Sequence, residues 1–168
     1  MNQHLVSAEL PALVLRAALG RFATGVTIVG CRAGDGGWVG LTANSFSALS
    51  LEPALVLWSL RSASPNLQAF VAASHFAINV LAENQVDLSR RFASPVRNKF
   101  HGVATHTGLG GMPLIDGCAA YIECRTHSTQ VAGDHLLFIG RVERVHTANR
   151  RPLVYVGGRY CGLGPETG

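Results

Sequence analysis

Hydrophobic and polar positions in the first third of the chain predict one helix followed by strands. Leu15, Leu19 and Phe22 recur at helical spacing, which predicts a helix of about three turns from near Pro11, a residue tolerated in a first turn. β-Branched and apolar runs then follow, two of them separated by turn residues 34–37, as in a hairpin. The expected strands of this part cover residues 27–31, 38–44 and 54–60.

The middle of the chain mixes helices with strands. Ser64-Pro65 has the cap-then-proline order of a helix start, and that helix is expected to end near Ser74. Residues 75–81 alternate, with Phe76, Ile78 and Val80 expected on one side of a strand. A short polar-faced helix is expected over 84–92, followed by a loop that runs to Gly117.

The last third is β in character and decides the fold class. The expected strands cover residues 119–131, 136–146 and 152–156. Turn residues separate them, Gly133-Asp134 among them. Many short strands with two to four helices, and no strand–helix alternation, predict a mainly β protein with a closed or partly closed antiparallel barrel.

Length and composition predict a single domain that forms an oligomer. A chain of 168 residues with 48% hydrophobic residues is the size of a single domain, expected over 1–168 with its core at about 15–163. Only 14% of the residues are charged. A surface with so little charge is often covered in part by a second subunit, so we expect a homodimer.

Charge, cysteines and hydropathy exclude several classes. The net charge of +4 comes from arginines and Lys99, which are scattered along the chain, so we expect no nucleic-acid partner. The four cysteines show no C-x-x-C spacing, and we expect no metal site. Residues 1–8 lack the pattern of a leader, and no apolar run is long enough to span a membrane. We therefore expect a cytoplasmic protein with reduced thiols.

Candidate chemistry is sparse outside one polar cluster. No G-x-G-x-x-G, G-x-S-x-G, H-E-x-x-H or Walker motif is present. Hydroxyl and amide residues instead crowd one apolar stretch and the region after the next strand: Thr42, Asn44, Ser45, Ser47, Ser50, Ser59, Arg61, Ser62 and Ser64. These groups either bind a polar ligand or cap turns and bond to local backbone, as Ser and Thr commonly do.

Two further features leave alternatives open. Gly133-Asp134-His135 reads as ordinary turn chemistry, or as a functional histidine held at a strand entrance. Arg97 and Lys99 flank a loop, where they either clamp a phosphate or remain solvated. Taken alone, the residues predict a ligand-binding β-barrel whose ligand is polar.

The order of five segments resembles one family, the small flavin reductases that serve two-component flavin-dependent monooxygenases on an FMN-binding split barrel of Greek-key type. The resemblance covers nearly the whole chain, and each segment is weak alone. The segments are R-F-A-T-G-V-T-I-V (21–29), G-L-T-A-N-S-F (40–46), S-L-E-P-A-L-V (50–56), F-A-I-N-V-L (76–81) and G-D-H (133–135).

The resemblance implies a function: hydride transfer from NADH or NADPH to FMN or FAD, which makes the chain an NAD(P)H:flavin oxidoreductase. It also implies the flavin-binding residues Thr42, Ala43, Asn44, Ser45, Ser59, Leu60, Ser62, Ser64, Lys99 and Phe100, with Arg97 a weaker candidate. His135 matches the histidine beside the nicotinamide, which we take as the catalytic position, and Tyr160 matches an aromatic residue on the nicotinamide side.

The implied partner is a separate monooxygenase that receives reduced flavin by diffusion. The chain departs from the family pattern in Glu52-Pro53-Ala54, where a double proline is common, and in a short tail after Tyr160. Two rival functions remain: a flavin-binding module without catalysis, and an interaction barrel without a ligand. Flavin-dependent NADH oxidation separates the first rival from a reductase, and stabilisation by added flavin excludes the second.

Overall fold

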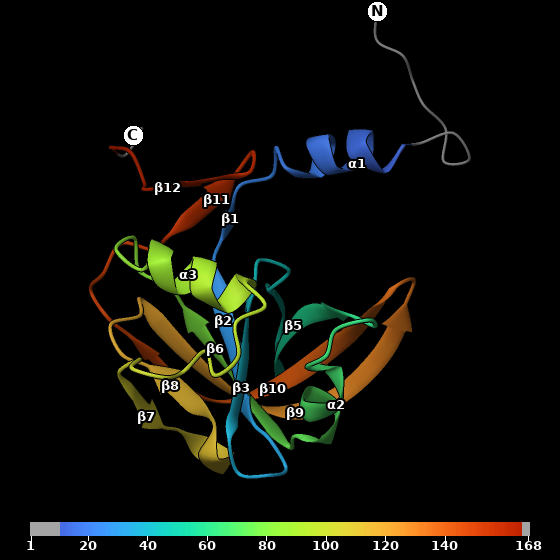
Figure 1. Ribbon diagram of the computed structural model, residues 1–168, viewed down its shortest axis with the longest axis vertical. Helices are drawn as coiled ribbons and strands as arrows, with labels where there is room; N and C mark the ends of the chain where they lie inside the picture. Colours follow the sequence, from blue (N-terminus) through green and yellow to red (C-terminus); the bar gives the residue numbers. More distant parts are fainter. Residues whose placement is uncertain (1–10, 166–168) are drawn as a thin grey trace, which may run out of the picture.

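The computed structural model describes residues 11–165 and shows one large curved sheet with small elements around it (Figure 1). The expectation for residues 1–8 lies outside the described residues. The large sheet has seven antiparallel strands in the order β3-β2-β6-β9-β10-β5-β4. They are β2 (Thr27–Arg32), β3 (Trp38–Ala43), β4 (Ser47–Leu51), β5 (Ala54–Arg61), β6 (His75–Val80), β9 (Ala120–Ala132) and β10 (His135–Thr147).

Smaller elements cover the large sheet or extend from one end of it. A three-stranded sheet contains β1 (Thr24–Gly25), β11 (Val154–Val156) and β12 (Arg159–Cys161). A two-stranded sheet contains β7 (Thr105–Thr107) and β8 (Pro113–Ile115), with the 3-10 turn Leu109–Gly111 between them. The helices are α1 (Ala12–Leu19), α2 (Leu67–Ala72) and α3 (Val86–Ala93). The predicted mainly β, partly closed antiparallel barrel with two to four helices is confirmed.

The large sheet is buried on both faces at its centre. On β2, Ile28 belongs to a core cluster that also includes Phe92 of α3, and its neighbour Val29 belongs to the opposite cluster, with Trp58 and Phe70. Strand β6 is likewise buried on both sides. The prediction that Phe76, Ile78 and Val80 lie on one side of this strand is confirmed, since all three belong to or pack against the cluster that contains Trp58. Ala77 on the other side belongs to the cluster that contains Phe92, because α3 and the β7–β8 sheet cover the outer face.

Several element boundaries differ from the sequence prediction. Strand β4 falls on residues 47–51, where no strand was expected. Its side chains are largely exposed, those of Leu49 and Leu51 included, so the segment has no buried face. The expected loop before Gly117 contains β7, the 3-10 turn and β8, and strand β12 was also missed. Helix α1 is shorter than expected and ends at Leu19, with Phe22 beyond it.

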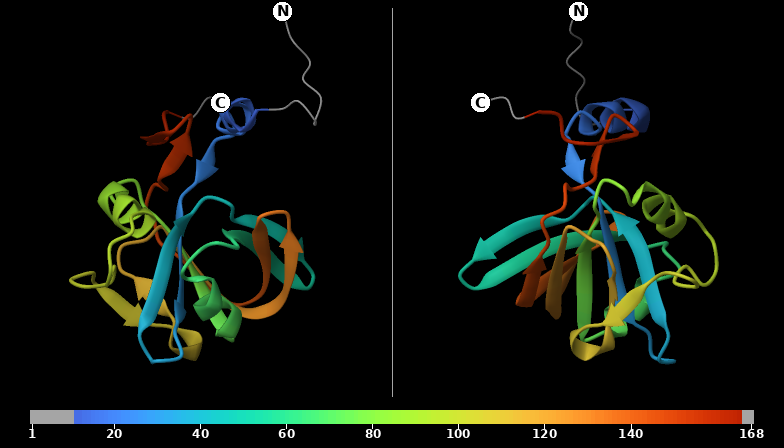
Figure 2. Two further views of the ribbon diagram at one scale, coloured as in Figure 1. Left: turned by 45° about the vertical axis from the view of Figure 1, so that its right-hand side comes forward. Right: turned by 90° about the vertical axis from the view of Figure 1, so that its left-hand side faces the viewer.

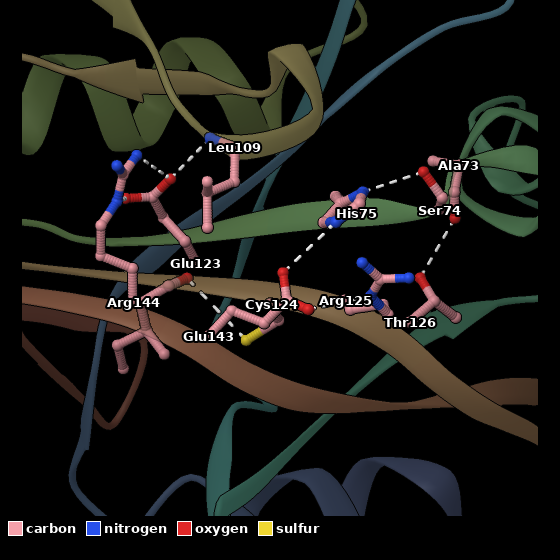
Figure 3. A network of polar contacts seen from close by, with 11 residues as sticks. Ala73, Ser74, His75, Leu109, Glu123, Cys124, Arg125, Thr126, Glu143 and Arg144 are labelled. Carbon is pink, nitrogen blue, oxygen red and sulfur yellow. Dashed lines mark hydrogen bonds and ion pairs between the residues drawn. The ribbon is translucent and has the colours of Figure 1, made fainter.

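A polar network ties the β7–β8 loop to the centre of the large sheet (Figure 3). Buried Glu123 accepts hydrogen bonds from Arg144, with Nε at 2.5 Å, and from the Leu109 amide at 2.7 Å. Burial alone would raise the pKa of Glu123, but the bonds from Arg144 and Leu109 outweigh it and hold the pKa below its usual value. A second group joins His75 to Glu143, with Nε2–Oε2 at 3.3 Å.

The barrel is open between β3 and β5. Strand β4 pairs with β5 only as far as Ser47 opposite Leu57, so the last four residues of β5 have no strand on that side. Ser45 partly replaces the missing strand. Its hydroxyl donates to the Ser59 carbonyl and accepts from the Ser59 amide, both at 3.1 Å. One side chain thus links the exit of β3 to β5 across the opening.

Helix α1 extends from the barrel beside β11 and β12 and buries none of its residues (Figure 2). It exposes the apolar side chains of Leu13, Leu15 and Leu19, and Phe22 follows them with 78% of its surface exposed. Such an unpartnered apolar face is unusual on a monomer. No helix among residues 11–165 is long and apolar enough to cross a membrane.

Candidate functional site

A cavity of about 490 Å³ lies at the opening of the barrel, and we name it the split cavity. Its walls are the end of β3 with the following turn, the end of β5 with the loop into α2, and the first residue of β10. The lining residues are Leu41, Thr42, Ala43, Asn44, Ser45, Ser59, Leu60, Arg61, Ala63, Ser64, Pro65 and His135. Its size matches that of cavities for small organic ligands.

The chemistry of the split cavity is apolar with hydroxyl and amide groups, and its lining includes no carboxylate. The lining includes the apolar residues Leu41, Ala43 and Leu60 and the polar residues Thr42, Asn44 and Ser64. A flat, apolar ring with a polar rim suits such walls, because the ring is buried against the apolar groups and its rim finds hydrogen bonds.

Thr42 is fixed by a chain of hydrogen bonds that begins at the other end of the sequence. Its Oγ1 donates to the Ser89 carbonyl of α3 at 2.6 Å, and the Ser89 hydroxyl lies 2.9 Å from the hydroxyl of Tyr160 on β12. Because the single Thr42 proton is used in this way, its oxygen can only accept a hydrogen bond from a ligand.

His135 stands at the rim of the split cavity, opposite Arg61 in the pairing of β10 with β5. Its Nδ1 lies 2.7 Å from Asp134 Oδ1, and this contact with His135 lowers the pKa of Asp134. The carboxylate therefore orients the ring and leaves Nε2 for a ligand. The side chain of His135 is 37% exposed, so it can reach a molecule that enters from solvent.

A second cavity of about 720 Å³ adjoins the split cavity and shares five lining residues with it. The shared residues are Leu41, Thr42, Leu60, Ser64 and Pro65. Beyond them it is lined by Trp38, by Phe92 of α3 and by the loop 94–100. A Cβ at Gly40 would come within 2.8 Å of Phe100 and 2.9 Å of Phe92, so only glycine lets these rings pack against β3.

The structure brings most of the predicted site residues together, but not all of them. Seven of the flavin candidates line the split cavity: Thr42, Ala43, Asn44, Ser45, Ser59, Leu60 and Ser64. Lys99 and Phe100 line the second cavity instead, and Ser62 lines neither. Tyr160 also lines neither cavity and reaches the site only through Ser89.

Three residues that the sequence prediction omits from the site also line the split cavity: Arg61, Ala63 and Pro65. Arg61 belongs to the polar cluster recognised in the sequence, and this membership is the signal that could have placed it in the site. Within residues 11–165, no group of three potential ligands could hold a metal ion.

Comparisons with known proteins agree with this geometry. The flavin reductase-like domain matches residues 19–164. The reductase component of a flavin-dependent trigonelline monooxygenase from Acinetobacter baylyi is 45% identical over 146 residues, which cover 87% of this chain and 47% of that protein. The reductase subunit HsaB of a flavin-dependent monooxygenase from Mycobacterium tuberculosis is 40% identical over 164 residues, which cover 96% of this chain and 87% of HsaB.

Solved structures show the same fold. The NADH:FAD oxidoreductase SgcE6 of Streptomyces globisporus, in complex with NAD and FAD fragments, superposes with a TM-score of 0.91 and 33% identity, covering 99% of this chain and all of that one. The flavin reductase PheA2 superposes with a TM-score of 0.84 and 35% identity, covering 92% of this chain and 99% of that one. The chain spans about half the length of the first curated relatives it matches, at 47% of each.

Proposed function

Since the chain belongs to the flavin reductase-like domain family, we propose that it is an NAD(P)H:flavin oxidoreductase that transfers hydride from NADH or NADPH to FMN or FAD. The observation that carries the proposal is the split cavity, whose apolar walls and polar rim fit a flavin ring. Its relatives include reductase components of flavin-dependent monooxygenases, among them HsaB.

In the proposed site, a few residues would bind the flavin and orient the nicotinamide. A bound flavin supplies a ring that accepts a hydride at near-contact distance from a nicotinamide. Asn44 and Ser64 would hold polar atoms of the flavin, and Thr42 would accept a hydrogen bond from it. His135, at the rim, would orient the nicotinamide. Positioning of this kind is the main contribution that a protein makes to hydride transfer, so a nucleophile or a paired acid and base is not required.

The test is steady-state oxidation of NADH or NADPH with FMN, FAD or no flavin added. We expect oxidation that depends on the added flavin. A chain that binds flavin, seen as a shifted flavin spectrum, but oxidises no NADH or NADPH would be a binding module instead. A chain without any effect of flavin on its thermal unfolding would contradict flavin binding itself, because a ligand of the folded state must raise stability.

The proposal includes two partners. A second copy would cover the apolar face of α1, so we expect a homodimer whose interface helps to shape the flavin site; a monomeric mass with full activity in light scattering would refute this. A separate monooxygenase would receive the reduced flavin by diffusion. We place the reaction in the cytoplasm, where thiols stay reduced, because all four cysteines are free.

A further inference from the structure

The loop 108–111, which joins β7 to β8, fits closely around two side chains of the large sheet. A Cβ atom at Gly108 would lie 2.5 Å from Oε2 of Glu123, and one at Gly110 would lie 2.6 Å from Nδ1 of His75. Because glycine has no side chain at either position, the loop backbone lies directly against these polar groups.

Glu123 holds the loop by its backbone. Its Oε2 accepts a hydrogen bond from the Leu109 amide at 2.7 Å. Arg144 donates to the same carboxylate from Nε to Oε1 and from Nη2 to Oε2, the latter at 2.7 Å. Glu123 is only 4% exposed, so little water competes for these bonds, and the forked pair with Arg144 fixes the direction of the carboxylate. The position of the loop therefore depends on one buried, oriented carboxylate.

His75 supports the same loop from the neighbouring strand. Ala77 of β6 lies opposite Glu123 of β9, and His75, two residues before Ala77, lies on the same face of the sheet. The His75 ring has a partner at each nitrogen, with Nδ1 2.9 Å from the Ser74 hydroxyl and Nε2 3.3 Å from Glu143 Oε2. Figure 3 shows both groups of the polar network beside this loop, and the contacts at Gly108 and Gly110 join both groups to it.

The loop is linked in turn to the start of β3. The Gly111 carbonyl accepts a hydrogen bond from Nε1 of Trp38 at 3.0 Å, and this N–H is the only donor of an indole. Trp38 packs edge to face on Phe100 with ring centroids 5.6 Å apart, and Phe100 packs in the same way on Phe92 at 4.8 Å. All three rings line the second cavity, whereas Glu123 lines neither cavity. The orientation of this aromatic wall is thus linked to a carboxylate that lies outside both cavities.

We propose that Glu123 is a positioning residue for the proposed reaction, acting through the loop 108–111 on the Trp38 indole and so on the aromatic wall of the second cavity. This inference rests on the proposed function. Because the second cavity shares five lining residues with the split cavity, a displaced wall changes the space that is open to a bound cofactor. Glu123 itself touches no ligand, so its loss affects cofactor binding rather than the rate of hydride transfer.

Glu123→Gln tests the link because both neighbours of the carboxylate are hydrogen-bond donors. An amide in its place has a single acceptor oxygen, so it satisfies either Arg144 or the Leu109 amide and turns its own NH2 group toward the other. The first measurement is acrylamide quenching of tryptophan fluorescence. The chain has two tryptophans, and Trp58 is fully buried, so quenching reports Trp38. We expect the quenching constant to rise roughly twofold or more, because the released loop no longer holds the indole.

The second measurement separates binding from turnover. In Glu123→Gln we expect the Kd for FAD or the KM for NADH to rise roughly three- to tenfold, the effect of one lost hydrogen bond, while kcat changes less than about twofold. Trp38→Phe keeps a ring but removes the indole N–H, and it should raise the same constant. Adding Glu123→Gln to Trp38→Phe should have little further effect, because both changes break the same chain of contacts; a purely structural role of Glu123 would give additive effects.

Glu83→Gln is the matched control. Its carboxylate pairs with Arg151 at 3.6 Å and lies outside the polar network, so the same chemical change should alter neither measurement. Arg144→Lys keeps a cation beside Glu123 but loses the forked pair. It should change both measurements in the same direction as Glu123→Gln by a smaller factor, which keeps the test decisive if Glu123→Gln does not fold.

The inference is overturned if folded Glu123→Gln shows unchanged acrylamide quenching, a fall in kcat alone, or effects that add to those of Trp38→Phe. Failure of the proposed function is distinct, because the parent protein would then oxidise no NADH or NADPH with added flavin, whereas the quenching measurement needs no cofactor. Thermal unfolding of each variant confirms that it is folded.

Discussion

Replacement of Ser45 with alanine tests whether one hydroxyl holds the open side of the barrel in its binding geometry. The change removes two 3.1 Å hydrogen bonds and leaves both the amide and the carbonyl of Ser59 without this partner. An orphaned backbone group costs about 1–3 kcal/mol, and the lower part of that range applies here because the site is only partly buried and water can enter. We therefore expect the free energy of unfolding to fall by about 1–2 kcal/mol.

Flavin affinity should fall as well, since Ser45 and Ser59 both line the split cavity. We expect the Kd for FMN to rise roughly fivefold to tenfold, which corresponds to about 1 kcal/mol of lost positioning. Urea unfolding measures the first effect, and flavin fluorescence titration measures the second.

The matched control is Ser47→Ala. The Ser47 hydroxyl is exposed and donates only to the adjacent Ala48 carbonyl at 3.1 Å, so its removal should alter neither quantity. Equal stability and equal flavin affinity in Ser45→Ala and the parent protein would refute the idea that Ser45 substitutes for a strand. A loss of stability with unchanged flavin affinity would show that the Ser45–Ser59 hydrogen bonds support the fold but not flavin binding.

Three further outcomes are expected. His135→Ala should raise the KM for NADH roughly fivefold and leave flavin affinity unchanged, in steady-state kinetics and titration respectively; loss of flavin binding instead would contradict its place on the nicotinamide side. Tyr160→Phe should leave the KM for NADH unchanged and lower stability by about 1 kcal/mol, because its hydroxyl meets Ser89 rather than a cavity; a raised KM would restore a nicotinamide role. Glu123→Gln should remove part of the acid sensitivity of folding. The pKa of Glu123 is lower in the folded chain than the usual 4.5, so its contribution to the free energy of unfolding is present above that pH and is lost as the pH falls toward the folded value. Urea unfolding of both proteins at several pH values checks this, and identical pH dependences would contradict it.

The sequence predicted the strands whose apolar residues are continuous, and it predicted that they form an antiparallel barrel, but it did not predict their order in the sheet. Strand β2 is one such run, and it is buried on both faces. By contrast, β4 and β7 were not predictable from hydrophobic pattern, because their side chains are mostly exposed and their backbone pairing alone defines them. Exposed edge strands of this kind carry little periodic signal.

The sequence showed that polar residues cluster at the site, but it did not show which role each of these residues has. The pattern could not show that Ser45 bonds to Ser59, because that contact depends on where β4 stops pairing with β5. Nor could it place Tyr160, which lies far from Thr42 in sequence but is linked to it through Ser89. In the segment 76–81, buried Asn79 satisfies the backbone of Ile28, Pro113 and Ile115, so part of the family resemblance reflects folding rather than chemistry.

The open edge of β5 also has a consequence for the protein before it meets flavin. Beyond Leu57, this strand presents backbone toward the split cavity with Ser45 as its only substitute for a neighbouring strand in the described part of the chain. Unpaired edges recruit strands from other molecules, which begins aggregation. A bound flavin would shield that edge, so amide hydrogen exchange at Ser59 and Arg61 should slow when flavin is added. Bound flavin would then protect the barrel against aggregation, in addition to accepting the hydride in the proposed reaction.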